Sequence, residues 1–228
     1  MTVSLPVLFT TKAKANEGRV ADGRSAFRSI ASAAGLTLAL LGGLAAAEAG
    51  TADAFTFSSS DLASGKFDKK FTLNAFGCTG ANISPSLEWR HAPAGTKAFA
   101  IQVMDLDGPG GITIAHWAIY NIPGTVTELY QGAGNSPSGL PAPAFGGNTD
   151  FLDTGVGGGN GNYAGPCPPA GDKPHKYQFT IYAYAMPDVQ AAAGVPKTGA
   201  AGLYGFVLNK GIGNALLGKA SFVAEYGR

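Results

Sequence analysis

The chain has 228 residues, of which 45% are hydrophobic and 14% are charged, and its formal net charge is +1. This length fits one folded domain preceded by a leader, and the near-neutral charge provides no basic field that would attract a nucleic acid. The 34 Gly and 14 Pro residues, with strand-like segments broken by turns, favour a β-rich fold over a helical bundle.

The first 54 residues have the order of a secretory signal peptide. Residues 29–47 carry no charge, are rich in Ala, Leu and Gly, and follow a long segment that contains several arginines. Small residues at 47 and 49, and again at 52 and 54, fit a cleavage site, and a transmembrane helix is the alternative interpretation. We therefore predict a signal peptide with an extended start at residues 1–54, a folded domain at 55–228, and a periplasmic or secreted protein.

Both cysteines, Cys78 and Cys167, lie in the predicted domain. The oxidising compartment outside the cytoplasm permits a disulfide between them, which would tie the loop around Asn82 to the loop before His175. Two separate buried thiols are the alternative, because the sequence does not give the distance between them.

The middle of the chain predicts a β-hairpin. Short strands around a turn-rich loop are expected over residues 55–91, and residues 97–107 form the clearest strand. Asp105 and Asp107 end that strand on one face, because side chains alternate with a period of two. A glycine-rich turn then returns the chain through a strand at 116–122, so that both carboxylates are expected near His116.

The second half of the chain predicts a long loop, a buried strand and a short helix. Residues 132–161 are rich in Gly, Asn and Pro, as expected for a surface loop. Residues 175–186 carry bulky side chains on both faces, which is typical of a central strand between two layers. One short helix is expected over residues 202–217 and a closing strand over 220–226.

The histidines and aspartates near these loops do not match a known catalytic or metal pattern. The spacing of Asp105, Asp107, His116 and His175 is not that of a zinc site. There is no Gly-x-Ser-x-Gly motif, Cys167 between two prolines suits a structural role, and two aspartates at i and i+2 are too close together to flank a sugar bond. We therefore predict no enzyme activity, no metal and no cofactor, with a hydrolase kept as a third alternative.

The same residues suit the recognition of an anion. Backbone N–H groups of a Gly/Pro loop at 163–177 can form an anion-binding nest, and a protonated imidazole of His175 adds positive charge. The aspartates are expected to accept hydrogen bonds from a ring or a loop amide and so to raise the imidazole pKa. The alternative is structural, with the aspartates capping the turn and His116 a satisfied core histidine.

Four segments, at residues 82–89, 105–109, 116–123 and 165–177, resemble the phosphatidylethanolamine-binding protein family, in particular its bacterial Raf-kinase-inhibitor-like members. The resemblance implies a mainly β fold of two antiparallel sheets with a short C-terminal helix, and a small pocket for phosphate-type anions such as phospholipid head groups. It implies that this pocket is lined or shaped by Asp105, Asp107, Pro109, His116, Cys167, Pro169, His175 and Tyr177.

The sequence also departs from the family pattern. Leu106 stands where the family usually has Pro. Ile114 stands where an aromatic is common, so the sequence does not predict the hydrophobic wall that the family has in its pocket. Residues 157–162 resemble an insertion at the pocket mouth that could act as a lid. We do not predict kinase inhibition for this chain, because an exported protein does not meet a cytosolic kinase. A protein inhibitor or interaction module that acts through its surface is the alternative function, and a homodimer and an unidentified protein partner are left open.

Overall fold

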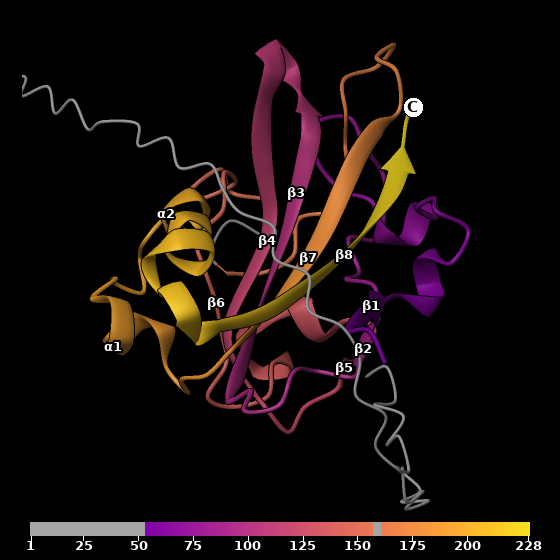
Figure 1. Cartoon of the computed structure of the whole chain (residues 1–228). Helices are drawn as coiled ribbons and strands as arrows, with labels where there is room; N and C mark the ends of the chain where they lie inside the picture. The colour runs from indigo at the N-terminus through magenta and orange to yellow at the C-terminus, as the bar shows by residue number, and fades with distance from the viewer. Residues whose placement is uncertain (1–52, 157–160) are drawn as a thin grey trace, which may run out of the picture. The chain divides into compact units, whose positions relative to one another are not determined.

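The computed structural model describes residues 53–156 and 161–228, so nearly all of the predicted signal peptide lies outside the described residues. The described strands form two antiparallel sheets (Figure 1). The smaller sheet has the order β1-β2-β5, with β1 at Thr56–Ser58, β2 at Leu87–Arg90 and β5 at Glu128–Leu129. The larger sheet has the order β6-β4-β3-β7-β8, with β6 at Phe145–Gly146, β4 at Ile112–Pro123, β3 at Ala98–Gly108, β7 at His175–Tyr184 and β8 at Leu216–Tyr226.

Two short α-helices precede the last strand, α1 at Val189–Ala193 and α2 at Ala201–Phe206. The chain continues from α2 through a π turn at Val207–Gly211 and a 3₁₀ turn at Gly213–Ala215 before β8 begins. The single helix expected over residues 202–217 is therefore wrong in extent. Gly213 has a φ of +52°, in the left-handed region, which no α-helix accepts within its interior.

The predicted hairpin is present as β3 and β4. Its turn is a 3₁₀ turn at Pro109–Gly111, in which Gly110 and Gly111 have φ values of +75° and +79°. Glycine adopts such values without steric cost, which is why the chain can reverse here. β7 pairs with the other edge of β3, so the end of β3 and the start of β7 lie side by side. This junction positions the site described below.

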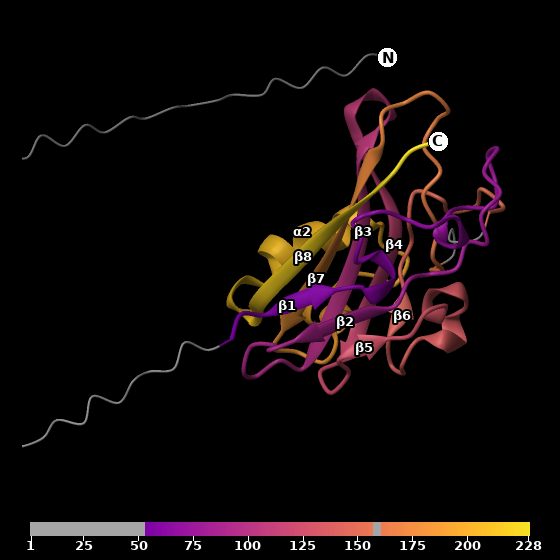
Figure 2. The ribbon, with the colours of Figure 1, turned by 90° about the vertical axis from the view of Figure 1, so that its right-hand side faces the viewer.

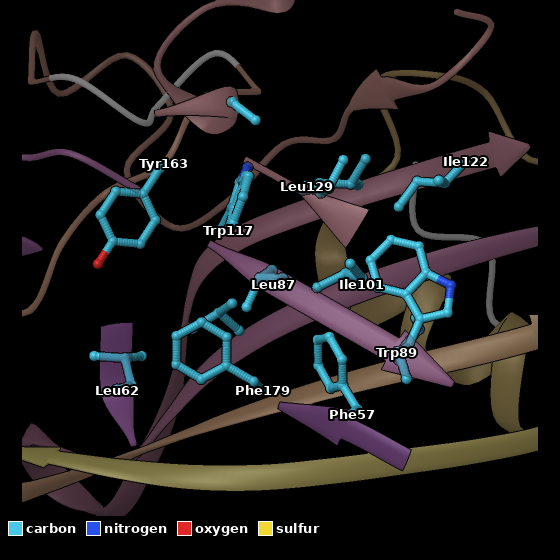
Figure 3. Close-up of a cluster of buried hydrophobic side chains, with 14 of the residues drawn as sticks. Phe57, Leu62, Leu87, Trp89, Ile101, Trp117, Ile122, Leu129, Tyr163 and Phe179 are labelled. Atoms are coloured by element: carbon cyan, nitrogen blue, oxygen red, sulfur yellow. The ribbon is translucent and has the colours of Figure 1, made fainter. Parts of the chain in front are cut away.

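The five-stranded sheet is covered on both faces (Figure 2). On one face, Ile101, Trp117 and Phe179 pack with residues of the small sheet such as Leu87 and Trp89 (Figure 3). The other face packs against the helical segments through a separate cluster that includes Tyr120, Tyr182, Tyr184, Val189, Tyr204 and Leu208. β7 contributes to both clusters, which confirms the prediction of a strand between two layers and gives it a rigid position.

The segment at 132–161 is not simply a surface loop, so that prediction is wrong in part. β6 pairs with β4, and Ala133 and Leu140 are buried in the main core. A β-carbon on Gly134 would lie 2.3 Å from the Trp117 ring, so a glycine is needed for this close approach. The apolar residues of the segment are scattered without a period, which is why the pattern did not reveal them. The lid expected at residues 157–162 falls mostly outside the described residues.

Candidate functional site

A cavity of about 360 Å³ lies where the end of β3, the start of β4 and the start of β7 meet. Seven of the eight predicted site residues line it, namely Asp105, Pro109, His116, Cys167, Pro169, His175 and Tyr177. The eighth, Asp107, does not. Five lining residues were not predicted as site residues: Phe76, Ile114, Phe151, Pro168 and Arg228.

A buried histidine–aspartate pair forms the floor of this cavity. Nδ1 of His175 lies 2.8 Å from Oδ2 of Asp105, and both side chains are almost completely buried. The other carboxylate oxygen of Asp105 accepts a hydrogen bond from the Asp107 backbone N–H at 2.9 Å. Because a carboxylate only accepts, Nδ1 of His175 carries a proton, and the ring is held in one orientation.

Asp107 turns away from the cavity. Its carboxylate accepts hydrogen bonds from Nζ of Lys173 at 2.6 Å and from the Lys176 backbone N–H at 3.0 Å. The Lys173 hydrogen bond, followed by that of Lys176, lowers the pKa of Asp107 below its ordinary value. The expectation that both carboxylates lie near His116 is therefore wrong for Asp107. A register shift between Asp105 and Gly108 interrupts the alternation on which that expectation rested.

His116 is buried, and its burial favours the neutral form of the imidazole ring. Its Nδ1 lies 2.9 Å from the Ala164 carbonyl oxygen, which can only accept, so Nδ1 donates and Nε2 remains a hydrogen-bond acceptor. Burial lowers the His116 pKa more than the Ala164 carbonyl and the Asp105 carboxylate raise it. Asp105 thus acts on the His116 pKa in the expected upward direction, but desolvation outweighs this attraction and the net shift is downward.

The Tyr177 hydroxyl is buried close to the Asp105 carboxylate. It makes no hydrogen bond of standard geometry within the described part of the chain, but it lies near enough to Asp105 for that carboxylate to act on its pKa. Burial, followed by the negative charge of nearby Asp105, raises the pKa of this phenol well above its ordinary value. The phenol therefore keeps its proton at physiological pH, and Tyr177 is one of the residues that line the cavity.

The loop that closes the cavity is held by a disulfide and by one asparagine. A disulfide joins Cys78 and Cys167, whose Cα atoms lie 6.0 Å apart. Of the two alternatives, a bridge or two separate thiols, the structure therefore shows the bridge. Asn82 donates from Nδ2 to the Tyr163 carbonyl at 3.1 Å and accepts from the Gly165 N–H at 2.7 Å. These links tie the loop before β7 to the loop before β2.

Two phenylalanines complete a hydrophobic wall together with Ile114. The ring of Phe151 lies 4.9 Å from that of His116, and Phe76 lines the cavity although its side chain is 59% exposed. The wall that Ile114 seemed to leave incomplete is therefore supplied by residues from distant loops. The only sign of Phe151 in the sequence was that it is an isolated aromatic residue within the Gly-rich segment.

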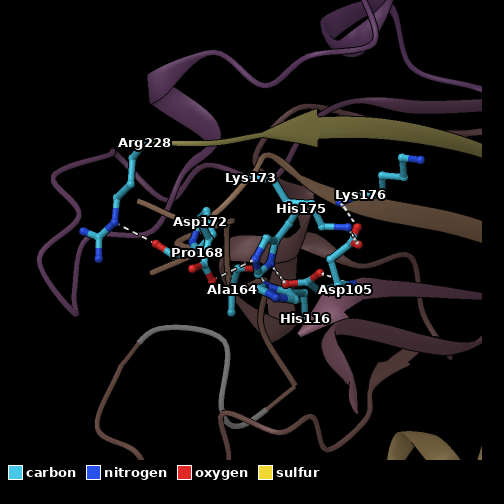
Figure 4. A network of polar contacts seen from close by, with 10 residues as sticks. Asp105, His116, Ala164, Pro168, Asp172, Lys173, His175, Lys176 and Arg228 are labelled. Atoms are coloured by element: carbon cyan, nitrogen blue, oxygen red, sulfur yellow. Dashed lines mark hydrogen bonds and ion pairs between the residues drawn. The ribbon is translucent and has the colours of Figure 1, made fainter. Parts of the chain in front are cut away.

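Two charged residues, Arg228 and Asp172, lie near the cavity (Figure 4). Arg228 donates from Nε to the Pro168 carbonyl at 2.7 Å and lines the cavity. Asp172 lies on the opposite side of the His175 ring from Asp105, with its Oδ2 3.5 Å from Nε2 of His175. Neither residue was predicted, because both reach the site through the packing of separate loops.

Across residues 53–156 and 161–228, no three or more His, Cys, Asp or Glu side chains are grouped so that they could hold a metal ion. In the same part of the chain, no helix combines the length and the apolar character needed to cross a membrane.

Comparison with known proteins relates the chain to two proteins of Escherichia coli. The UPF0098 protein YbcL is 39% identical over 160 residues, which cover 69% of this chain and 81% of YbcL. The UPF0098 protein YbhB is 38% identical over 126 residues, which cover 55% of this chain and 75% of YbhB. A putative lipoprotein of Mycobacterium tuberculosis, LppC, is 39% identical over 107 residues, or 47% of this chain and 46% of LppC.

Solved structures and a family model agree with this relationship. The crystal structure of E. coli YbcL, described as a member of the mammalian PEBP family, matches with a TM-score of 0.64 and 35% identity, covering 76% of this chain and 98% of YbcL. The model of the phosphatidylethanolamine-binding protein family matches residues 63–226. The two antiparallel sheets and the few short helices are those expected from the resemblance. The chain belongs to the phosphatidylethanolamine-binding protein family.

Proposed function

We propose that this protein binds a small phosphate-type anion, such as a phospholipid head group, in the cavity between His116 and His175. The observation that carries the proposal is Tyr177, which lines the cavity and whose buried hydroxyl makes no hydrogen bond of standard geometry among the described residues. A buried polar group without a partner costs about 1–3 kcal/mol, so a ligand that accepts this hydrogen bond gains that energy.

The polar groups around the cavity suit a protonated phosphate. Tyr177 offers a donor, Nε2 of neutral His116 offers an acceptor for a P–OH group, and Arg228 adds positive charge at the rim. The negative charge of Asp105 is offset by two hydrogen bonds, from His175 and from the Asp107 amide. The apolar walls keep water out and strengthen each of these interactions.

We propose that the protein binds its ligand without catalysing a reaction. The sulfur of Cys167 lies in a disulfide and is not a free nucleophile. Among the described residues that line the cavity there is no Ser, Thr or Lys. A hydrolase would therefore lack a protein nucleophile at this place, although His116 retains a basic nitrogen.

We also propose that the protein works in the cell envelope or outside the cell. The signal-peptide pattern at residues 1–54 and the disulfide both suit an oxidising compartment. The relative LppC, which is described as a putative lipoprotein, is consistent with such a place.

The test is calorimetric titration of the protein purified from the periplasm after expression of the whole chain. Inorganic phosphate and phosphoethanolamine are titrated separately, so that a free anion is distinguished from a head group. We expect saturable binding, weakened about tenfold or more in Tyr177→Phe, which removes one hydroxyl. Absence of saturable binding between pH 6 and pH 8 would overturn the proposal, as would equal affinity in the variant. In that case an interaction surface becomes the better explanation.

A further inference from the structure

The loop that precedes β7 offers few free N–H groups to the cavity. Within residues 163–169, which the structure describes in full, the N–H groups of residues 163–165 are already bonded, two to backbone carbonyl oxygens and one to Asn82. Residues 166, 168 and 169 are prolines, which have no N–H. In this stretch only Cys167 has an N–H that belongs to neither group. An anion in the cavity is therefore not met here by a row of backbone donors.

The side chains at the floor of the cavity present free lone pairs. Nε2 of His116 is an acceptor, because Nδ1 donates to the Ala164 carbonyl oxygen. The Asp105 carboxylate accepts one hydrogen bond on each oxygen, from the Asp107 N–H and from His175, so each oxygen keeps a further lone pair. Both His116 and Asp105 line the cavity.

Free side-chain donors are fewer among the described residues that line the cavity. The Tyr177 hydroxyl has a single proton to donate. The Arg228 guanidinium already donates from Nε to the Pro168 carbonyl oxygen at 2.7 Å and from Nη2 to a second carbonyl oxygen at 3.4 Å. The outer nitrogen of His175, Nε2, lies 3.5 Å from a carboxylate oxygen of Asp172 and so faces another acceptor (Figure 4). A ligand that brings only lone pairs would leave acceptors of the protein unpaired.

We propose that this pocket selects an oxyanion that still carries a proton, with Nε2 of His116 and the Asp105 carboxylate as the acceptors that recognise the proton. The ligand class is then inorganic phosphate or a free phosphomonoester, in preference to sulfate or to the phosphodiester of an intact phospholipid. This inference rests on the proposed function and narrows its ligand. Sulfate and a phosphodiester have no such proton near neutral pH, so they bury these acceptors without a partner.

Asp105 makes the selection sharper because it is charged and held in place. Its side chain is buried, and its two hydrogen bonds are 2.8 and 2.9 Å long. A P–OH group that donates to this carboxylate forms a charge-assisted hydrogen bond. An oxyanion without a proton instead brings a second negative charge against the first, and the two repel strongly in a poorly solvated site. The same residue therefore favours one class of anion and rejects the other.

The first experiment compares two ligands that differ by one proton. Methyl phosphate and methyl sulfate have the same shape, and at pH 6, close to the second pKa of about 6 of a phosphomonoester, about half of methyl phosphate carries one negative charge, as methyl sulfate does. Each is titrated by calorimetry into the protein purified from the periplasm after expression of the whole chain. We expect methyl phosphate to bind at least about tenfold more tightly.

The second comparison concerns the phospholipid. Dimethyl phosphate stands for the diester of an intact lipid, carries one negative charge and has no P–OH group. We expect it to bind as weakly as methyl sulfate does. Inorganic phosphate and sulfate, titrated in the same way, repeat the comparison without a methyl group.

Two variants separate the acceptor from the donor. His116→Phe removes an acceptor, and we expect the preference for methyl phosphate over methyl sulfate to fall at least about threefold. Tyr177→Phe is the matched control, because it removes a donor that serves both ligands alike. We expect it to weaken both and to leave their ratio unchanged. Circular dichroism shows whether each variant is folded, and the comparison of ligands in the wild type does not depend on either of them.

The outcomes separate this inference from the proposed function. If methyl phosphate binds while methyl sulfate or dimethyl phosphate binds equally well, selection by a proton is refuted and the anion pocket stands. An unchanged preference in folded His116→Phe would also overturn the inference. If neither methyl phosphate, inorganic phosphate nor phosphoethanolamine binds, the proposed function fails and the inference fails with it.

Discussion

Asp105 on β3 pairs directly with Tyr177 on β7. This register places the carboxylate beside the buried phenol of Tyr177, and His175, two residues before Tyr177, reaches the same carboxylate. The polar floor of the pocket therefore depends on the alignment of two strands that are separated by about 70 residues along the chain. Flexible loops do not set it, so the floor is expected to be preorganised.

Removal of the buried carboxylate should destabilise the fold. We expect Asp105→Ala to lower the free energy of unfolding by roughly 3 kcal/mol, because the change leaves His175 buried without its partner. Denaturant unfolding followed by circular dichroism measures this change.

The matched control is a double variant, Asp105→Ala with His175→Phe. It removes both members of the pair, and we expect it to lose less stability than the sum of the two single variants, since no unpaired charge remains. Additive losses would show that the pair contributes no coupling energy.

Loss of the disulfide should affect stability more than affinity. Cys78 and Cys167 are 89 residues apart, and a bridge of that span constrains the unfolded chain by about 4 kcal/mol. We expect Cys78→Ala with Cys167→Ala to lose about this amount in denaturant unfolding. The wild type should lose a similar amount in the presence of a reductant, whereas the double variant should not respond to it. A wild type that is insensitive to full reduction would contradict this account.

His116 should make stability depend on pH near neutrality. Its pKa is lowered from 6.5 in the folded protein by burial, so below pH 6.5 the unfolded chain binds a proton that the folded chain does not. The free energy of unfolding should therefore fall as the pH drops from 6.5 toward the lowered pKa, by up to about 1.4 kcal/mol per pH unit.

The check is denaturant unfolding at several pH values between 5 and 8, in the wild type and in His116→Gln. The glutamine amide can still donate to the Ala164 carbonyl but does not titrate. We expect a shallower pH dependence in the variant. Parallel curves would show that His116 is not the titrating group.

Asn82 should act on the pocket from a distance. Its side chain makes two hydrogen bonds to the backbone of the loop that carries Cys167, and its φ of +52° suits an asparagine better than most other residues. We expect Asn82→Ala to cost about 2 kcal/mol of stability. Because this loop also positions Pro168 and Pro169, phosphate affinity should fall as well. Calorimetry and unfolding measured on the same sample test both effects, and unchanged affinity would show that the disulfide alone holds the loop.

Local patterns of the sequence were enough for the long strands. The period of two predicted β3, bulky residues on both faces predicted β7, and the glycine-rich turn predicted the hairpin to β4. Short strands such as β6 were not predicted. A strand of two residues is too short to show a periodic pattern, and its pairing depends on a partner that is distant in sequence. The helix before β8 was overextended because propensity does not show where the chain must turn toward the sheet.

The sequence by itself determined the β-rich class, the residue types of the pocket and the family resemblance, since these depend on alternation, turn chemistry and short motifs. Only the tertiary structure decided that Asp105 faces His175 while Asp107 faces Lys173, that Phe151 forms a wall beside His116, and that Asp172 stands on the outer nitrogen of His175. The physical reason is that strand register, a local register shift and the packing of distant loops set these contacts, and none of the three is encoded within a short stretch of residues.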